Sequence, residues 1–221
     1  MEIHEQFVYN AWIKSLKYIL DNGTDFIDRD KRNCREILNL VIIIDNPEED
    51  YEKPIDEMQN FDWIYPSKEE LESIMLHKEN MSGYDYSYGP RIFNFRGVDQ
   101  INNFIIPLLK SDPTSRRAVI SLFDPSTDSN VMSKNIPSLL YIYFKIKNEK
   151  LDLTCSIRSN DLFIGWPGNI YQIVLLQRYV SHLLGIKTGS LTTISGSAHI
   201  FHEHFEIIEE LLKRKNSQNI L

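Results

Sequence analysis

Two apolar stretches, residues 139–146 (LLYIYFKI) and 151–158 (LDLTCSIR), constrain the fold most, because only four polar residues separate them. The first stretch is rich in β-branched and aromatic residues, which pack well on the pleated surface of a sheet. The connection, residues 147–150 (KNEK), is short and polar, as in a hairpin loop. The pattern therefore predicts a β-hairpin of two long strands.

Further periodic segments surround this hairpin. Val8, Trp12, Leu16 and Ile19 recur at helical spacing and predict an opening amphipathic helix that stops at Asn22-Gly23. The region from residue 47 to about residue 87 is acidic and reads as irregular apart from one helix. The other expected elements are strands at 36–45, 116–125 and 190–200 and helices at 67–76, 97–110, 169–184 and 202–215. Because strands and helices do not alternate as βαβ units, we expect a single α+β domain over residues 1–221 with a mainly antiparallel or mixed sheet.

The net charge of the chain restricts the kinds of partner that it can bind. The 221 residues carry a formal net charge of −7, so most of the surface should repel a phosphodiester backbone. We expect no nucleic acid polymer as a partner, and the lack of a basic stripe disfavours an RNA-binding repressor. No apolar run approaches the ~20 residues that span a bilayer, and the start has no signal-peptide pattern, so we expect a cytoplasmic protein without a membrane partner. Cys34 and Cys155 are too few for a disulfide framework and are expected to be free thiols.

Four arginines stand out in this acidic chain: Arg29, Arg116, Arg117 and Arg158. A guanidinium at the end of a strand can present a planar fork of donors to a phosphate, and several such groups could hold a dianion. The alternative is that they form ordinary surface ion pairs with the 31 acidic residues. The residue types alone leave both interpretations open.

Four segments together resemble the thymidylate synthase family, which includes the pyrimidine nucleotide hydroxymethylases of phages and of nucleoside-antibiotic pathways. They are DPTSRRAVIS, IPSLLYIYFKI, IRSNDLFIGWPGNIYQIVLL and SGSAHIFHEH, in the family's order and close to its spacing. The resemblance covers roughly residues 84–204 well and the N-terminal third weakly. It implies a three-layer sandwich around a large twisted mixed sheet and a homodimer formed through that sheet. It also implies 5,10-methylenetetrahydrofolate as the cofactor.

The resemblance assigns roles at the phosphate end of a nucleotide. Arg158 and Ser159 would bind the 5′-phosphate of a pyrimidine nucleoside monophosphate together with Arg29 of the same subunit. Arg116 and Arg117 would reach the same phosphate from the partner subunit. These roles would explain an arginine excess in an acidic protein.

The resemblance also assigns residues to the base and the sugar. Asn169 would bind the pyrimidine edge, since its amide offers a donor and an acceptor that suit N3–H and O4 of uracil. Family members that act on cytosine often carry Asp there, so Asn169 favours uracil, whereas the antibiotic-pathway relatives often use cytidine nucleotides. As an alternative, Asn169 is only a helix N-cap. His199 would contact the 3′-hydroxyl, and Phe201 stands where the family usually has Tyr, which suggests a different sugar such as ribose.

Two further residues have roles only through the resemblance. Tyr88 matches the tyrosine that helps to place a catalytic water, and Asp161 would accept hydrogen bonds from the pterin of the folate. Their plainer interpretations are a packing residue and a turn residue. His199, His202 and His204 lie close in sequence, but no Cys or carboxylate cluster completes a tetrahedral site, so we expect no metal.

The largest departure from the family is Ser138, which follows Pro137 where the family has its catalytic cysteine. A cysteine thiolate adds to C6 of the pyrimidine, whereas a serine hydroxyl does not ionise without a dedicated base. Three explanations are open: a deliberate Cys→Ser change made to trap a complex, which we favour; a natural noncatalytic nucleotide-binding paralogue; or a serine with unrecognised help. Cys155 is not a ready substitute, because its direction on the second hairpin strand is not known from sequence.

The product is expected to be hydroxymethyl rather than methyl. The methylating enzymes keep water out partly with a hydrophobic C-terminal tail and a tryptophan-rich segment, and neither has a match in this sequence. The hypothesis is a folate-dependent C5 hydroxymethyltransferase with Ser138, Tyr88 and Asn169 as its catalytic positions, and a thymidylate synthase-type methyltransferase on dUMP as the alternative. The general-base glutamate falls in the poorly matched third, where Glu52, Glu70 and Glu72 are all candidates.

Overall fold

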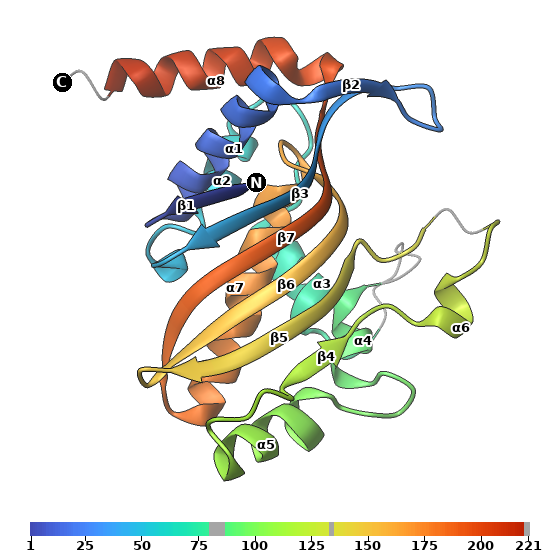
Figure 1. Cartoon of the computed structure of the whole chain (residues 1–221), viewed down its shortest axis with the longest axis vertical. Coiled ribbons are helices and arrows are strands. Elements are labelled where there is room, and N and C mark those ends of the chain that lie inside the picture. The colour runs from blue at the N-terminus through green and yellow to red at the C-terminus, as the bar shows by residue number, and fades with distance from the viewer. Residues whose placement is uncertain (80–86, 133–134, 219–221) are drawn as a thin grey trace.

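The computed structural model of the chain describes residues 1–79, 87–132 and 135–218. Within these residues seven strands form one mixed sheet in the order β1-β3-β7-β6-β5-β4, with β2 also paired to β3 (Figure 1). The pairs β1/β3 and β6/β7 are parallel and the others antiparallel. The strands are β1 Glu2–Glu5, β2 Thr24–Ile27, β3 Asn33–Ile44, β4 Val119–Ser121, β5 Leu139–Lys147, β6 Lys150–Asp161 and β7 Lys187–Phe201. The α+β class with a mixed sheet is therefore confirmed.

The central hairpin forms as the sequence predicts. β5 pairs antiparallel with β6 from Leu139 to Lys147, and only Asn148 and Glu149 lie between the two strands. Both have positive φ, 50° and 58°, which is the backbone of a two-residue hairpin turn whose twist matches that of the strands. β6 is thereby fixed beside β7 in the middle of the sheet.

The long helix α7 packs on β6 and β7, behind the sheet in the view of Figure 1, and α1 packs on β3. The helices α2, α3 and α5 contact α7. The helices are α1 Val8–Asn22, α2 Lys53–Gln59, α3 Lys68–Leu76, α4 Tyr88–Phe93, α5 Ile106–Ser111, α6 Pro125–Asp128, α7 Gly165–Leu184 and α8 Phe205–Gln218. No helix in the described ranges is long and apolar enough to cross a membrane.

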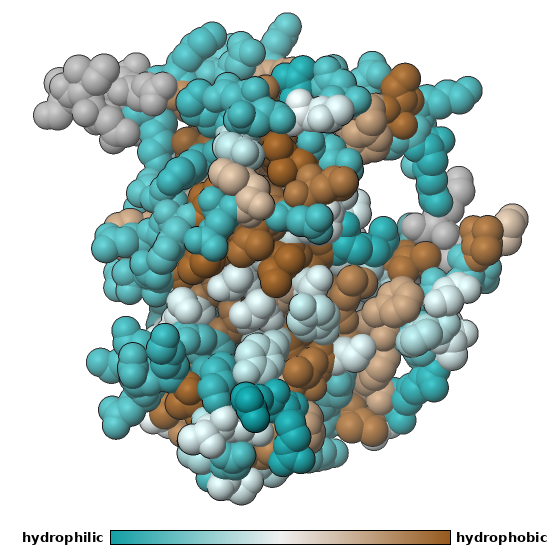
Figure 2. Space-filling view, in the orientation of Figure 1, coloured by the Kyte–Doolittle hydropathy of each residue, from teal (hydrophilic) through white to brown (hydrophobic). Residues whose placement is uncertain are grey.

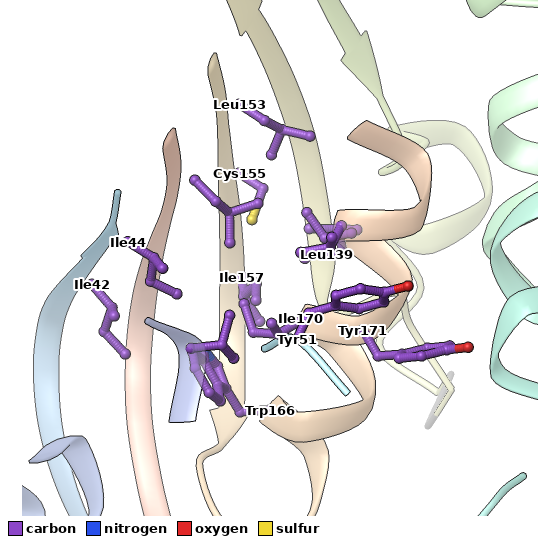
Figure 3. Packing of buried hydrophobic residues seen from close by; sticks show 14 of the residues in the cluster. Ile42, Ile44, Tyr51, Leu139, Leu153, Cys155, Ile157, Trp166, Ile170 and Tyr171 are labelled. Atoms are coloured by element: carbon purple, nitrogen blue, oxygen red, sulfur yellow. The ribbon is translucent and has the colours of Figure 1, made fainter. Parts of the chain in front are cut away.

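The core lies between the sheet and α7. Leu153, Cys155 and Ile157 of β6 point toward α7, which presents Trp166 and Ile170 to the strands (Figure 3). All five side chains are at most 1% exposed. Since burying one large apolar side chain contributes about 1.5–3 kcal/mol, this contact fixes the position of α7, which carries part of the candidate site.

Three expectations about the elements were wrong. The chain opens with a short strand, β1, before the first helix, and the region from residue 47 to about residue 87 contains a 3-10 turn and α2 besides the expected α3. The segment β6-α7-β7 is a βαβ unit, because β6 and β7 run parallel on either side of α7 in the sequence. The sequence pattern did not reveal the βαβ unit, because the hairpin of β5 and β6 indicated antiparallel neighbours and gave no sign that β6 also pairs with β7 in parallel.

Several elements have other bounds than expected, and three of them differ for a clear physical or structural reason. α7 begins at Gly165 rather than Asn169, because Pro167 falls in its first turn, where the missing N–H costs nothing. Residues 97–110 do not form one helix: a π-helical turn over Ile101–Ile105 precedes α5, which places Pro107 in the first turn of α5. The strand expected at 116–125 shrinks to β4.

Candidate active site

A cavity of about 690 Å³ opens between the start of α7, the helix α3 and the end of β6. Ser138, Arg158 and Asn169, three of the sequence-derived candidates, line it together, and Tyr88 lies in the same wall. Arg158 is the only charged side chain among the described residues of the lining. The other described lining residues are Ile64, Tyr65, Pro66, Leu71, Ile74, Ser87, Asn135, Ile136, Ile164, Gly165, Gly168 and Gln172. The described lining therefore offers a ligand one positive charge among neutral side chains, some apolar and some polar.

The Arg158 guanidinium is held in a fixed direction. Its Nε donates to the carbonyl of Pro137 at 3.0 Å and its Nη2 to the carbonyl of Ile136 at 2.8 Å. The backbone N–H of Arg158 also donates to the carbonyl of Ser138 at 2.8 Å. These bonds tie the end of β6 to the segment that carries Ser138 and leave other guanidinium donors for an anion.

Ser138 is half-buried beside this arginine. None of the described residues that line the cavity is a His, Asp, Glu or Cys. The nearby Tyr88 is 8% exposed, and its hydroxyl accepts the backbone N–H of Leu139 at 3.4 Å. The described lining thus supplies no general base that could ionise the Ser138 hydroxyl.

Neither cysteine can replace the missing thiol. Cys155 is fully buried on β6 with its sulfur toward α7 (Figure 3), and burial raises the pKa of its thiol. Cys34 is 1% exposed on β3, and burial raises the pKa of its thiol to about 11. Both groups stay protonated at neutral pH.

Asn169 sits in the second turn of α7 and belongs to a polar chain. Its Nδ2 donates to Oδ1 of Asn160 at 3.5 Å, and Nδ2 of Asn160 donates to Oγ of Ser195 at 2.9 Å. Asn160 is 1% exposed and Ser195 is fully buried. Asn169 is therefore not the N-cap of α7. Its side-chain amide is bonded to the buried Asn160, which is bonded in turn to the buried Ser195.

Asp161 has a structural task at the start of α7. Its Oδ1 accepts the backbone N–H groups of Phe163 at 2.9 Å and Ile164 at 3.1 Å. These bonds close the turn between β6 and α7, as expected for an Asx turn. Neither Asp161 nor Ser159 lines the cavity.

His199 lies outside the described lining as well. It is 8% exposed on β7, and its Nδ1 has no hydrogen-bond partner in the described part of the chain. Its ring meets Phe201 edge-on at 5.2 Å between centroids. The Arg32 guanidinium covers the Phe201 ring at 3.2 Å and also pairs with Glu203.

The remaining three arginines are exposed. Arg29 lies in the turn between β2 and β3, 3.8 Å from Asp30, and Arg116 and Arg117 precede β4. None of the three lines the cavity of its own chain. The single chain therefore brings together Arg158, Ser138, Asn169 and Tyr88, but not Arg29, Arg116 or Arg117.

The three candidate glutamates differ in their surroundings. Glu52 pairs with Lys68 at 2.6 Å, and the hydrogen bond from Lys68 lowers the pKa of its carboxyl. Glu72 is exposed and lines a different cavity, together with Arg178. Glu70 lies on α3 four residues before Ile74, which lines the site, so the two share a helix face.

Sequence reasoning missed Tyr65, which builds one wall of the cavity. Its hydroxyl donates to the carbonyl of Ile164 at 2.7 Å and accepts the N–H of Gly168 at 3.1 Å. A Cβ on Gly168 would come within 3.3 Å of that hydroxyl and 3.2 Å of Leu71, so glycine leaves room for the tyrosine. The sequence held no signal of this contact, because Gly168 lies just before the helix predicted at 169–184 and only the earlier start of α7 at Gly165 puts it in the first turn.

Sequence reasoning also gave no role to Asn160, although its neighbours Arg158, Ser159 and Asp161 were all candidates. A polar side chain in a strand otherwise packed against the core was the available signal. Among the described residues, no three His, Cys, Asp or Glu side chains group closely enough to hold a metal ion.

Comparison with known proteins gives one family. The family model described as Thymidylate synthase matches residues 62–220. A protein of Methanosarcina mazei named "Putative thymidylate synthase" is 33% identical over 215 residues, which are 97% of this chain and 95% of its own. A protein of the same name from Methanothermobacter marburgensis is 29% identical over 221 residues, 96% of this chain and 98% of its own. The thymidylate synthase of Mycoplasma genitalium is 36% identical over 127 residues, 58% of this chain and 43% of its own.

Proposed function

The chain belongs to the thymidylate synthase family, a family of one-carbon transferases, and on that premise we propose that its cavity binds a pyrimidine nucleoside 5′-monophosphate for folate-dependent transfer to C5 of the base. One observation carries the proposal. Ser138, Arg158 and Asn169, from three separate segments, line the same cavity. An anion-binding fork, an amide for a base edge and the position of the family's nucleophile thus face one space.

Each side chain has a physical role in this proposal. The free donors of Arg158 bind the 5′-phosphate, assisted by Ser159 and by Arg29 from its exposed turn. Asn169 pairs with the pyrimidine edge and places C6 beside Ser138. His199, whose Nδ1 lacks a partner in the described residues, donates or accepts at a sugar hydroxyl.

Arg116 and Arg117 are proposed to act on the partner's site in a homodimer. None of the described helices covers the sheet face opposite α7, and apolar side chains gather over its middle (Figure 2). Val119 and Tyr141, which alternate with the buried Ile120 and Ile142, are 41% and 38% exposed. A contiguous apolar face of this kind is typical of an interface between subunits.

Sedimentation measurements test the dimer. Tyr141→Lys should shift the protein toward monomer, whereas Val131→Lys, at an exposed apolar position in the loop after α6, should not.

Replacing Arg116 and Arg117 together by alanine should weaken nucleotide binding, although neither lines the cavity of its own chain. Unchanged binding would contradict the trans role of the two arginines.

Ser138 determines what the chain can do after binding. Addition to C6 needs a nucleophile ionised near neutral pH, and a hydroxyl with no base beside it does not meet this need. We therefore propose that the chain with Ser138 binds nucleotide without turnover and that Ser138→Cys restores one-carbon transfer. The Arg158 guanidinium close by would lower the pKa of a thiol at that position.

The residues around the mouth of the cavity fit the folate. Ile64, Ile74 and Ile164 give its rim an apolar surface that suits a flat aromatic group. When bound, 5,10-methylenetetrahydrofolate supplies the one-carbon unit. Asp161 is proposed to accept from the pterin with the oxygen that does not close the turn before α7. Ile64 is fully exposed, so water has access to the rim, which supports a hydroxymethyl product.

Product analysis of Ser138→Cys with UMP, dUMP, CMP or dCMP and the folate decides the reaction. A 5-hydroxymethyl nucleotide formed together with tetrahydrofolate is expected. A 5-methyl nucleotide formed together with dihydrofolate would instead favour the methyltransferase alternative.

Glu70 is the glutamate we propose as the general base, because α3 turns the face of Ile74 to the cavity and Glu70 shares that face. In the Ser138→Cys background, Glu70→Gln should lower kcat by about 10²- to 10⁴-fold, as for loss of a general base. Glu72→Gln, on the same helix but toward the other cavity, is the matched control.

A noncatalytic nucleotide-binding paralogue is the second candidate. The absence of His, Asp, Glu and Cys from the described lining favours it, because nothing there activates Ser138. A Ser138→Cys protein that binds nucleotide and folate but forms no product would support this candidate over the enzyme.

A further inference from the structure

Asn160 forms the base of the candidate site without lining the cavity. The side-chain amide is 1% exposed and bonded on both sides, to Ser195 and to Asn169. A buried amide that has lost water must keep such bonds, because an unsatisfied buried group is costly. The orientation of Asn160 is therefore coupled to that of Asn169.

In the structure, Nδ2 of Asn160 donates to Oγ of Ser195, while Oδ1 of Asn160 faces Asn169 and accepts from its Nδ2 at 3.5 Å. If the Asn169 amide turned over, its Oδ1 would face the Oδ1 of Asn160, and two acceptors would meet without a hydrogen. The arrangement thus keeps Oδ1 of Asn169 available to the cavity.

We propose that Asn160 is a positioning residue that locks the amide of Asn169 in one orientation and thereby makes the site select uracil over cytosine. This inference rests on the proposed function, in which Asn169 pairs with the base. Uracil presents a donor at N3 and an acceptor at O4, whereas cytosine presents an acceptor at N3 and a donor at N4. A freely turning amide can match either edge, and a locked amide with its oxygen toward N3 matches uracil alone.

The size of the selectivity follows from the cost of a mismatch. A lost hydrogen bond with a group left unsatisfied corresponds to a change in affinity on the order of 10- to 100-fold. The wild-type chain should therefore bind UMP at least about tenfold more tightly than CMP. Asn160→Leu, which removes the acceptor at similar volume, should bring the two dissociation constants within about threefold of each other.

Calorimetric titration of the full chain with UMP and with CMP measures this ratio. Asn160→Asp keeps a carboxyl oxygen toward Asn169 and should retain the preference for UMP. Ser195→Ala removes the group that orients Asn160, so it should reduce the ratio even if Asn160→Leu does not fold. Gln177→Leu is the control. It removes a buried side-chain amide on α7 that is bonded to the carbonyl of Leu151, and it should lower stability without changing the ratio of the two dissociation constants.

The outcomes separate the inference from the function on which it rests. Equal binding of UMP and CMP by the wild type, or a preference for CMP, would overturn the role of Asn160 while the nucleotide site stands. The same conclusion would follow if the ratio of the two dissociation constants stayed unchanged both in Ser195→Ala and in a folded Asn160→Leu protein. If neither nucleotide bound the wild type, the proposed function would fail and this inference with it.

Discussion

Tyr65 bridges two backbone groups of α7 across one wall of the cavity, and Tyr65→Phe isolates the contribution of its hydroxyl. The substitution keeps the ring but removes the donor to the Ile164 carbonyl at 2.7 Å and the acceptor for the Gly168 N–H at 3.1 Å. The two partners are four residues apart at the start of α7, the spacing of a carbonyl and an N–H that pair within a helix, so the hydroxyl bridges one helical turn. Burial raises the pKa of the Tyr65 hydroxyl, as expected for a group shielded from water.

The expected loss of stability follows from these two bonds. The Ile164 carbonyl and the Gly168 N–H keep each other as helical partners, so the loss is that of one bridging hydroxyl, and Tyr65→Phe should lower the free energy of unfolding by about 1–2 kcal/mol. For a chain of this length that corresponds to a fall in Tm of roughly 2–8 °C. Because Tyr65 lines the cavity, affinity for nucleotide should fall as well.

Urea denaturation followed by circular dichroism measures the free energy of unfolding. Tyr18→Phe is the control, because Tyr18 is half-buried and its hydroxyl has no hydrogen bond in the described part of the chain. Gly168→Ala should also destabilise, and less so when Tyr65 is already Phe, since the Cβ then no longer meets the hydroxyl. A Tyr65→Phe protein within about 0.5 kcal/mol of wild type would refute the reasoning.

Further predictions concern pH. The pKa of Asp25 is lowered to about 2 by its hydrogen bond from Arg35, and that of Asp124 is lowered by its hydrogen bond from Arg96. A lowered carboxyl pKa contributes stability above the unfolded value near 3.9 that is lost as the pH falls, so the free energy of unfolding should drop between about pH 4 and pH 2, and less steeply in Asp124→Asn. Burial lowers the pKa of His204, so stability should also decline as the pH falls below about 6.5. His204→Phe should flatten that part of a thermal-unfolding pH profile, and an unchanged slope would contradict the assignment.

Local patterns in the sequence predicted the hairpin β5-β6 and most of α7. Two apolar stretches joined by a short polar connection indicate the hairpin, and Gly185, which has φ 71°, follows the predicted helix at 169–184. β1 could not be found this way, because a four-residue strand gains its stability from parallel pairing with β3, some 39 residues away (Glu2 with Val41). Local propensity holds no information on such a partner.

The candidate site shows the same contrast between residues that the sequence identifies and residues whose partners lie far away in the chain. Ser138, Arg158 and Asn169 were identified through the family resemblance, and the fold brings them to one cavity. Tyr65 escaped detection because its partner Gly168 is 103 residues away, and Asn160 because its role depends on Ser195 on a neighbouring strand. Contacts of this kind exist only once the sheet and α7 have packed.

The burial of both native cysteines makes the chain unusually suited to selective chemical labelling. Cys34 and Cys155 are at most 1% exposed, and their thiols stay protonated at neutral pH. A Ser138→Cys protein would thus carry a single thiol that an alkylating reagent can reach while the fold is intact. A fluorophore or a heavy atom attached there would report directly on whatever enters the cavity, and its protection by a nucleotide would measure occupancy without any need for turnover.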